Sequence, residues 1–218
     1  MPKKRDYIAE ILDQRSRFSH DGVRWRQFRE RNAALIGIAQ MLEDGPEKHA
    51  ADRAEALRYL PIGAVACVEG YFRLLIRDLI NSGGVYTERA AKLDEIKLDV
   101  RIIARLGGAS VTPGELIAHL LPMSSLEDIA RHTSLLLDLD LISTVKKTPV
   151  TIGRGASKAV MPRLVELLRE LYRVRNIFCH EIAVQEKLDF VRAVRLLAAA
   201  FTFVHATELI VEGEKAFD

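Results

Sequence analysis

The stretch from Leu164 to Ile182, LVELLRELYRVRNIFCHEI, places apolar residues at the spacing of an α-helix. Six positions in steps of four or three residues share one side of that helix, and we call them the apolar stripe: Leu164, Leu168, Leu171, Arg175, Phe178 and Ile182. Because a guanidinium buried without a partner is costly, Arg175 needs an anion, a polar cleft or a subunit boundary. A salt bridge to a glutamate of a neighbouring helix would satisfy it as well as a functional site would.

A second side of the same helix is polar. Four residues spaced four, three and four apart form what we call the polar ridge: Arg169, Arg173, Asn176 and His180. Histidine is the side chain best suited to exchange protons near neutral pH, and Asn176 adds a hydrogen-bond donor and acceptor beside it. An ordinary surface histidine would give the same pattern, so the ridge leaves both interpretations open.

Helical spacing continues through most of the chain. We expect helices at about residues 5–17, 21–42, 50–81, 158–182 and 185–211, with two or three short ones between 88 and 138. Pro61 should kink or split the third helix. Residues 141–152 carry the exceptional strand-like pattern, which predicts a short extended loop between residues 142 and 157. The chain therefore predicts one all-α domain over residues 1–218, with an N-terminal helical extension (1–45) and a core (50–211).

The composition restricts the class of protein. The 218 residues are 49% hydrophobic and carry a formal net charge of +2, so one sizeable core is possible and no global field draws the chain onto nucleic acid. Cys67 and Cys179 stand alone, which argues against a disulfide framework or a zinc site and favours a reducing cytoplasm. No uninterrupted apolar run approaches the ~20 residues of a membrane span. We expect a cytoplasmic protein with no membrane partner.

Positive charge gathers just before the apolar stripe. Residues 142–165 contain no acidic residue but hold Lys146, Lys147, Arg154 and Lys158. Together with Arg173, these cations are candidates for contacting a phosphate backbone. A solvated loop is the alternative explanation.

Two charged residues of the third predicted helix are further candidates. Glu69 and Arg73 lie four residues apart, on one face. We expect one of them to face Arg175 and His180 and position that site. The alternative is a simple ion pair within the helix. On an earlier helix, Trp25 and Phe28 are three residues apart, which favours a core-facing side over an RNA-stacking surface.

The six residues from Arg175 to His180, RNIFCH, form an Arg-x4-His pattern with asparagine directly after the arginine. The spacing alone is weak, because the segment from Arg15 to His20 also has it. In its helical setting, the pattern resembles the signature of HEPN domains, found in prokaryotic toxins, defence systems and RNA-guided ribonucleases. Residues 66–79 resemble an earlier core helix of such domains, and residues 112–117 and 125–129 resemble one bacterial branch. The resemblance covers roughly residues 50–210.

The resemblance implies a HEPN-like bundle with long paired helices and a metal-independent endoribonuclease that acts as a homodimer without cofactor or metal. His180 would be general base or acid, Arg175 would neutralise charge on the pentacoordinate phosphorus, and Asn176 would orient the histidine or a phosphate oxygen. Attack by the 2′-OH would leave a 2′,3′-cyclic phosphate and a 5′-OH. The protein would then be a toxin or anti-phage defence effector, with a cognate antitoxin or sensor protein as a possible partner.

Two questions stay open at this level. A catalytically inactive HEPN-like module that binds RNA or a partner protein would carry the same helices. In addition, positions five apart on an ideal helix are rotated by about 140°, so Arg175 and His180 do not face one point. Either the helix end distorts, or two copies complete a shared cleft.

Overall fold

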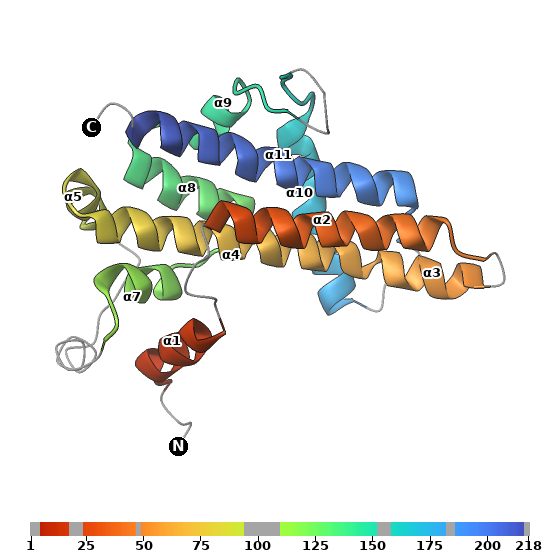
Figure 1. Cartoon of the computed structure of the whole chain (residues 1–218), viewed down its shortest axis with the longest axis horizontal. Helices are drawn as coiled ribbons and strands as arrows, with labels where there is room; N and C mark the ends of the chain where they lie inside the picture. The colour runs from red at the N-terminus through yellow and green to blue at the C-terminus, as the bar shows by residue number, and fades with distance from the viewer. Residues whose placement is uncertain are drawn as a thin grey trace. The chain divides into compact units, whose positions relative to one another are not determined.

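The computed structural model describes residues 5–17, 24–46, 49–93, 110–151, 158–181 and 186–215 (Figure 1). Within these residues the protein is all-α, and the one extended pairing is an isolated antiparallel bridge between Val150 and Ala159. The helices are α1 (Tyr7–Ser16), α2 (Arg24–Glu43), α3 (Ala50–Leu57), α4 (Tyr59–Ser82), α5 (Val85–Ala90), α7 (Pro113–Leu120), α8 (Leu126–Leu137), α9 (Leu141–Val145), α10 (Leu164–His180) and α11 (Phe190–Lys215). The expected all-α class is confirmed.

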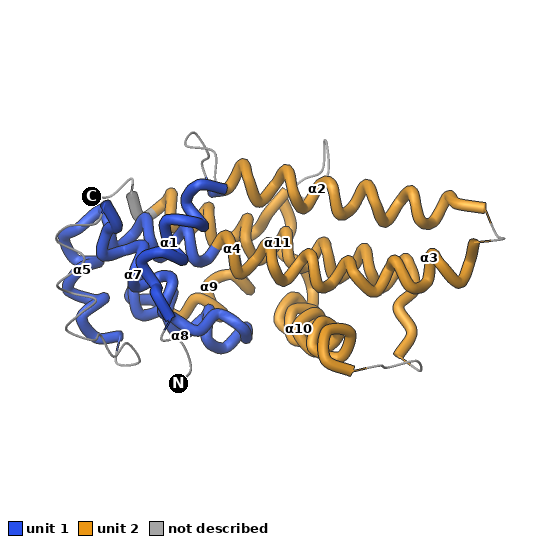
Figure 2. Tube along the Cα trace, turned by 90° about the horizontal axis from the view of Figure 1, so that it is seen from below, with its two compact units in different colours: residues 1–24, 72–139 blue, residues 25–71, 140–218 orange. Residues whose placement is uncertain are grey.

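The helices gather into two compact units (Figure 2). Unit 1 comprises residues 1–24 and 72–139, and unit 2 comprises residues 25–71 and 140–218. The boundary between them falls inside α4, which contributes its first half to unit 2 and its second half to unit 1. The single domain over residues 1–218, with an extension at 1–45 and a core at 50–211, stays a prediction.

In unit 1, α1 packs against α7. Ile8 and Ile11 of α1 are buried with Val111 and Leu116, whereas Leu12 is 39% exposed.

Helix α7 begins with a complete capping box. The Thr112 hydroxyl accepts a hydrogen bond from the Glu115 amide, and the Glu115 carboxylate accepts one from the Thr112 amide. Pro113 follows at the first helical position, where its missing N–H costs nothing. Gly114 then approaches α4 so closely that an added Cβ would lie 2.5 Å from the carbonyl oxygen of Arg77. The cap and the glycine together set how α7 lies on the second half of α4.

Ion pairs reinforce the contact between α1 and α7. Arg15 donates to Glu115 over 2.9 Å from its Nε, and the His119 ring lies 3.0 Å from Glu10. Arg5 also binds Glu10, over 2.7 Å. The hydrogen bond from Arg5 is the main reason why the pKa of Glu10 falls from its ordinary 4.5 to about 2. The arginine of the second Arg-x4-His pattern therefore has a structural partner, and His20 lies outside the described residues.

Unit 2 is built on α11, against which α9 and α10 pack. Trp25 stacks on Phe28 and on His205, with ring centroids 6.0 and 4.8 Å apart, and Phe201 adjoins all three. Phe28 is fully buried, so the prediction that this side of α2 faces the core is confirmed. Burial lowers the pKa of His205, which makes the neutral ring the favoured form in this cluster.

Three expectations about segment boundaries need correction or refinement. The predicted helix 158–182 begins only at Leu164, because Pro162 restricts the residue before it and Arg163 takes a left-handed φ of 56°. The predicted extended loop starts with a helix, α9, which Asp140 caps through the Ser143 amide. Pro61 does coincide with a split: it lies in the first turn of α4, directly after the break that ends α3.

Two stretches, Ala50–Ser82 and Phe190–Gly213, are long and apolar enough to cross a membrane when judged by length and composition alone. In their most apolar windows, 56% and 61% of the residues are buried inside the protein. Core helices of soluble proteins share this property, which favours that interpretation here. The cytoplasmic location stays a prediction.

Candidate functional site

The apolar stripe of α10 faces the interior of unit 2. Leu164, Leu168 and Leu171 are buried, Phe178 is half-buried, and Ile182 lies outside the described residues. Arg175 keeps only 20% of its side chain exposed, and its Nη2 lies 3.0 Å from Oε1 of Glu69 on α4. The salt bridge to a neighbouring glutamate, one of the two explanations for this arginine, is therefore present, and Glu69 faces Arg175 as expected.

The same guanidinium also reaches the polar ridge. Its Nη1 donates to the Oδ1 of Asn176 over 2.7 Å, while its Nη2 holds Glu69. Asn176 and His180 are four residues apart and so are neighbours on the helix surface. Arg175 is thereby held between the partly buried carboxylate of Glu69 and the ridge that ends in His180.

All four residues of the polar ridge are solvent-exposed. His180 is the last residue of α10, and the chain turns to an extended conformation at Glu181. Its imidazole forms no hydrogen bond or ion pair with the residues that the structure describes. An exposed imidazole at a helix end is accessible to a ligand. This position agrees both with an ordinary surface histidine and with a catalytic one.

A chain of ion pairs borders the ridge on the α11 side. Glu186 accepts from Arg173 over 3.1 Å and from Arg192 over 2.9 Å, and Arg192 also donates to Glu170 over 2.7 Å. The hydrogen bond from Arg192 is the main cause of the lowered pKa of Glu186. These contacts tie the segment after His180 back to both α10 and α11.

Arg58 is a site neighbour that the sequence pattern missed. Its guanidinium lies 5.6 Å from the ring centroid of Phe178, and it donates to Glu55 over 3.0 Å and to the carbonyl oxygen of Glu186 over 3.4 Å. Arg58 stands at the break between α3 and α4, more than a hundred residues before α10. No periodicity or spacing signal links positions so far apart.

The remaining candidates are distributed over both units. Lys146 and Lys147 are exposed just after α9, and Lys158 is exposed beside the Val150–Ala159 bridge, whereas Arg154 lies outside the described residues. Arg73 belongs to unit 1. Its Nη1 donates to main-chain oxygens at the end of α7, over 2.7 Å to Ala118 and 3.3 Å to Leu121. Arg73 therefore has a clear structural role as a cap of α7.

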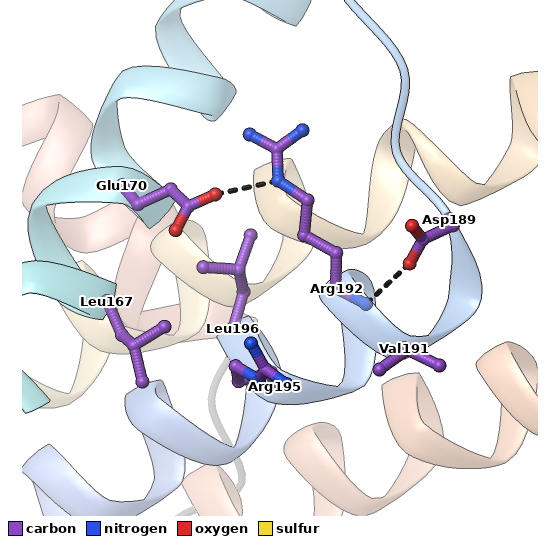
Figure 3. Close-up of a pocket in the computed structure, with 7 residues that line it drawn as sticks. All are labelled: Leu167, Glu170, Asp189, Val191, Arg192, Arg195 and Leu196. Atoms are coloured by element: carbon purple, nitrogen blue, oxygen red, sulfur yellow. Dashed lines mark hydrogen bonds and ion pairs between the residues drawn. The ribbon is translucent and has the colours of Figure 1, made fainter. Parts of the chain in front are cut away.

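A pocket of about 310 Å³ opens between α10 and the start of α11 (Figure 3). It is lined by three aliphatic and four charged side chains: Leu167, Leu196, Val191, Glu170, Asp189, Arg192 and Arg195. Figure 3 shows Arg192 between the two acids, with Glu170 bound to its side chain and Asp189 to its backbone amide. The sequence pattern did not single out this pocket.

Among the described residues, no three His, Cys, Asp or Glu side chains are grouped so that they could hold a metal ion. Comparison of the chain with known protein families, with curated proteins and with solved structures finds no match. The functional interpretation accordingly rests on the residues of α10 and their contacts.

Proposed function

We propose that this chain is a HEPN-type, metal-independent endoribonuclease of the cytoplasm, acting as a toxin or anti-phage defence effector. The observation that carries the proposal is the double contact of the Arg175 guanidinium, with Glu69 on one side and Asn176 of the exposed ridge on the other. An arginine held in this way is turned toward the ridge that ends in the accessible His180, and a fixed cation together with a histidine suits a phosphodiester substrate.

In the proposed reaction, the imidazole of His180 removes the proton of a ribose 2′-OH. The 2′-oxygen then forms a bond to the adjacent phosphorus while the bond to the 5′-oxygen breaks. A proton is returned to the leaving 5′-oxygen, so the products are a 2′,3′-cyclic phosphate and a 5′-OH. Arg175 offsets the charge that accumulates on the phosphoryl oxygens, and Asn176 holds its guanidinium toward the ridge.

The reaction needs both a general base and a general acid. The single His180 of one chain supplies one of these two roles at a time. A homodimer in which two α10 helix ends meet would supply one His180 for each role. It would also remove the difficulty that Arg175 and His180 are rotated by about 140° on one helix. The exposed ridge leaves His180 available for such an arrangement.

The proposal is tested by incubating purified wild type and His180→Ala with RNA in the presence of EDTA. The wild type should cut the RNA and leave 2′,3′-cyclic phosphate ends, and the variant should be at least about 100-fold slower, as is typical when a general base is lost. His49→Ala is the matched control, because His49 is also an exposed histidine and, among the described residues, its side chain contacts the nearby Asp52.

Two results would refute the proposal. A folded wild type that cuts no RNA and does not slow the growth of cells expressing it would refute the nuclease, and loss of cleavage in EDTA would refute the metal-independent mechanism. The first result would leave the second candidate, an inactive HEPN-like module that binds RNA or a partner protein. The Arg175–Glu69 salt bridge favours that candidate, because it gives the guanidinium an anionic partner without any substrate.

A further inference from the structure

We propose that the pocket between α10 and α11 binds one nucleotide of the RNA, and that it prefers guanine to uracil. This inference rests on the proposed function and names a feature of its substrate. The pocket volume of about 310 Å³ falls in the range of small-molecule sites, and its lining combines an aliphatic wall with a few charged groups.

Arg195 is the residue available to the phosphate. Each nitrogen of the Arg192 guanidinium already has a protein acceptor: its Nε, Nη1 and Nη2 lie 2.7 Å from Glu170, 2.6 Å from the Lys187 carbonyl oxygen and 2.9 Å from Glu186. Arg195, in contrast, is exposed and forms no hydrogen bond or ion pair with the residues that the structure describes. An arginine in this state can bind a phosphate bidentately without giving up a protein contact.

The carboxylates of Glu170 and Asp189 can accept hydrogen bonds from the N–H groups of a nucleobase. Glu170 uses Oε1 for Arg192, and Asp189 uses Oδ1 for the Arg192 amide, so each carboxylate has a second oxygen with lone pairs to offer. Guanine presents two adjacent N–H donors on one edge, N1–H and N2–H₂. Uracil presents a single N–H between two carbonyl oxygens, and a carboxylate repels these oxygens. The acids therefore favour guanine over uracil.

The apolar wall gives the base a surface to cover. Val191 is 63% exposed, which is a high value for a valine, and it lies beside Leu167 and the buried Leu196 in the pocket lining. A planar base laid against these side chains would remove their apolar surface from water. The pocket lining thus combines charged and apolar side chains, as a nucleotide combines a charged phosphate with the apolar face of its base.

The pocket also lies beside the polar ridge. Glu170 lines the pocket and precedes His180 by ten residues, which is about 15 Å along α10. Arg173 stands between them on the helix, and Glu186 links Arg173 to Arg192 at the pocket. An RNA strand that follows the ridge to His180 would therefore pass this pocket, and the bound nucleotide would lie a few nucleotides from the cleaved phosphodiester.

The test measures binding apart from cleavage. Isothermal titration of the wild type uses 5′-GMP, 5′-UMP and inorganic phosphate, followed by competition with 2′-O-methyl RNA octamers, which lack the attacking hydroxyl. GMP should bind more tightly than UMP or phosphate, and a guanine-containing octamer should displace it better than an all-uridine octamer does. Arg195→Ala should weaken GMP and octamer binding about 10-fold, as loss of a charged hydrogen bond does.

Two further variants keep the test sharp. Val191→Trp fills the pocket from a solvent-exposed position and should abolish GMP binding without unfolding the chain. Arg29→Ala changes an exposed arginine of α2 and should leave binding unchanged. Equal binding of GMP and phosphate, GMP binding that no octamer displaces, or binding that survives both Arg195→Ala and Val191→Trp would overturn the proposal.

The outcome is independent of the nuclease test. Suppose that binding depends on guanine, but the wild type does not cut RNA or His180→Ala cuts it equally fast. The proposed chemistry then fails, and the nucleotide site stands. If the wild type cuts RNA through His180 without guanine preference and Arg195→Ala has no effect, the nuclease stands and this site fails.

Discussion

The Arg175–Glu69 pair can be tested with a double-mutant cycle made from Glu69→Gln, Arg175→Met and the double variant. The two charged atoms lie 3.0 Å apart, and the side chains are 20% and 21% exposed, so the pair is neither a surface ion pair nor a fully buried one. Surface pairs contribute about 0.2–1 kcal/mol, and breaking a fully buried pair costs about 3–5 kcal/mol. We therefore expect each single variant to lose about 2 kcal/mol of unfolding free energy.

A loss of this size corresponds to a fall in melting temperature of roughly 4–8 °C for a chain of this length. The double variant should lose about 1–2 kcal/mol less unfolding free energy than the two single variants lose together. The reason is that methionine continues the apolar stripe of α10 once no carboxylate needs a partner. Urea unfolding followed by far-UV circular dichroism measures all three variants. Additive effects of the two substitutions, within about 0.3 kcal/mol, would show that the two residues do not interact in solution.

Three other predictions concern elements outside the site. Gly114→Ala should destabilise the protein by about 2 kcal/mol or more, because its methyl group would meet the main chain of α4. Gly70→Ala has open space at its Cβ and should stabilise α4 by about 0.5–1 kcal/mol. Thermal melts compare the two variants. Thr112→Ala removes the α7 cap and should cost about 1 kcal/mol in urea unfolding, an effect that would be absent if the capping box did not form. Because Arg5 lowers the pKa of Glu10 to about 2, the stability that this carboxylate contributes is complete above pH 4.5 and is lost as the pH falls toward 2. Glu10→Gln should flatten that part of the stability curve, and an unchanged curve would contradict the assigned contact.

Within single helices, sequence reasoning predicted well which residues are buried and which are exposed. Leu168 and Leu171 are buried and Asn176 and His180 are exposed, as the spacing of α10 required. These properties depend on the fixed rotation per residue of a helix, which is the same in every protein. The start of α10 was misplaced because apolar spacing continues through residues that Pro162 and the left-handed backbone at Arg163 exclude from the helix.

The amino-acid sequence by itself determined the all-α class, the position of an arginine in an apolar stripe and the exposed histidine that ends the polar ridge. Only the tertiary structure decided which partners these residues have: Glu69 for Arg175, and Glu186, which also binds Arg192, for Arg173. The physical reason is that helical periodicity is local, whereas an ion pair depends on how distant helices pack. The stripe required an anion for Arg175, but many acidic residues of the chain could have met that requirement, and the packing of α4 against α10 selected one.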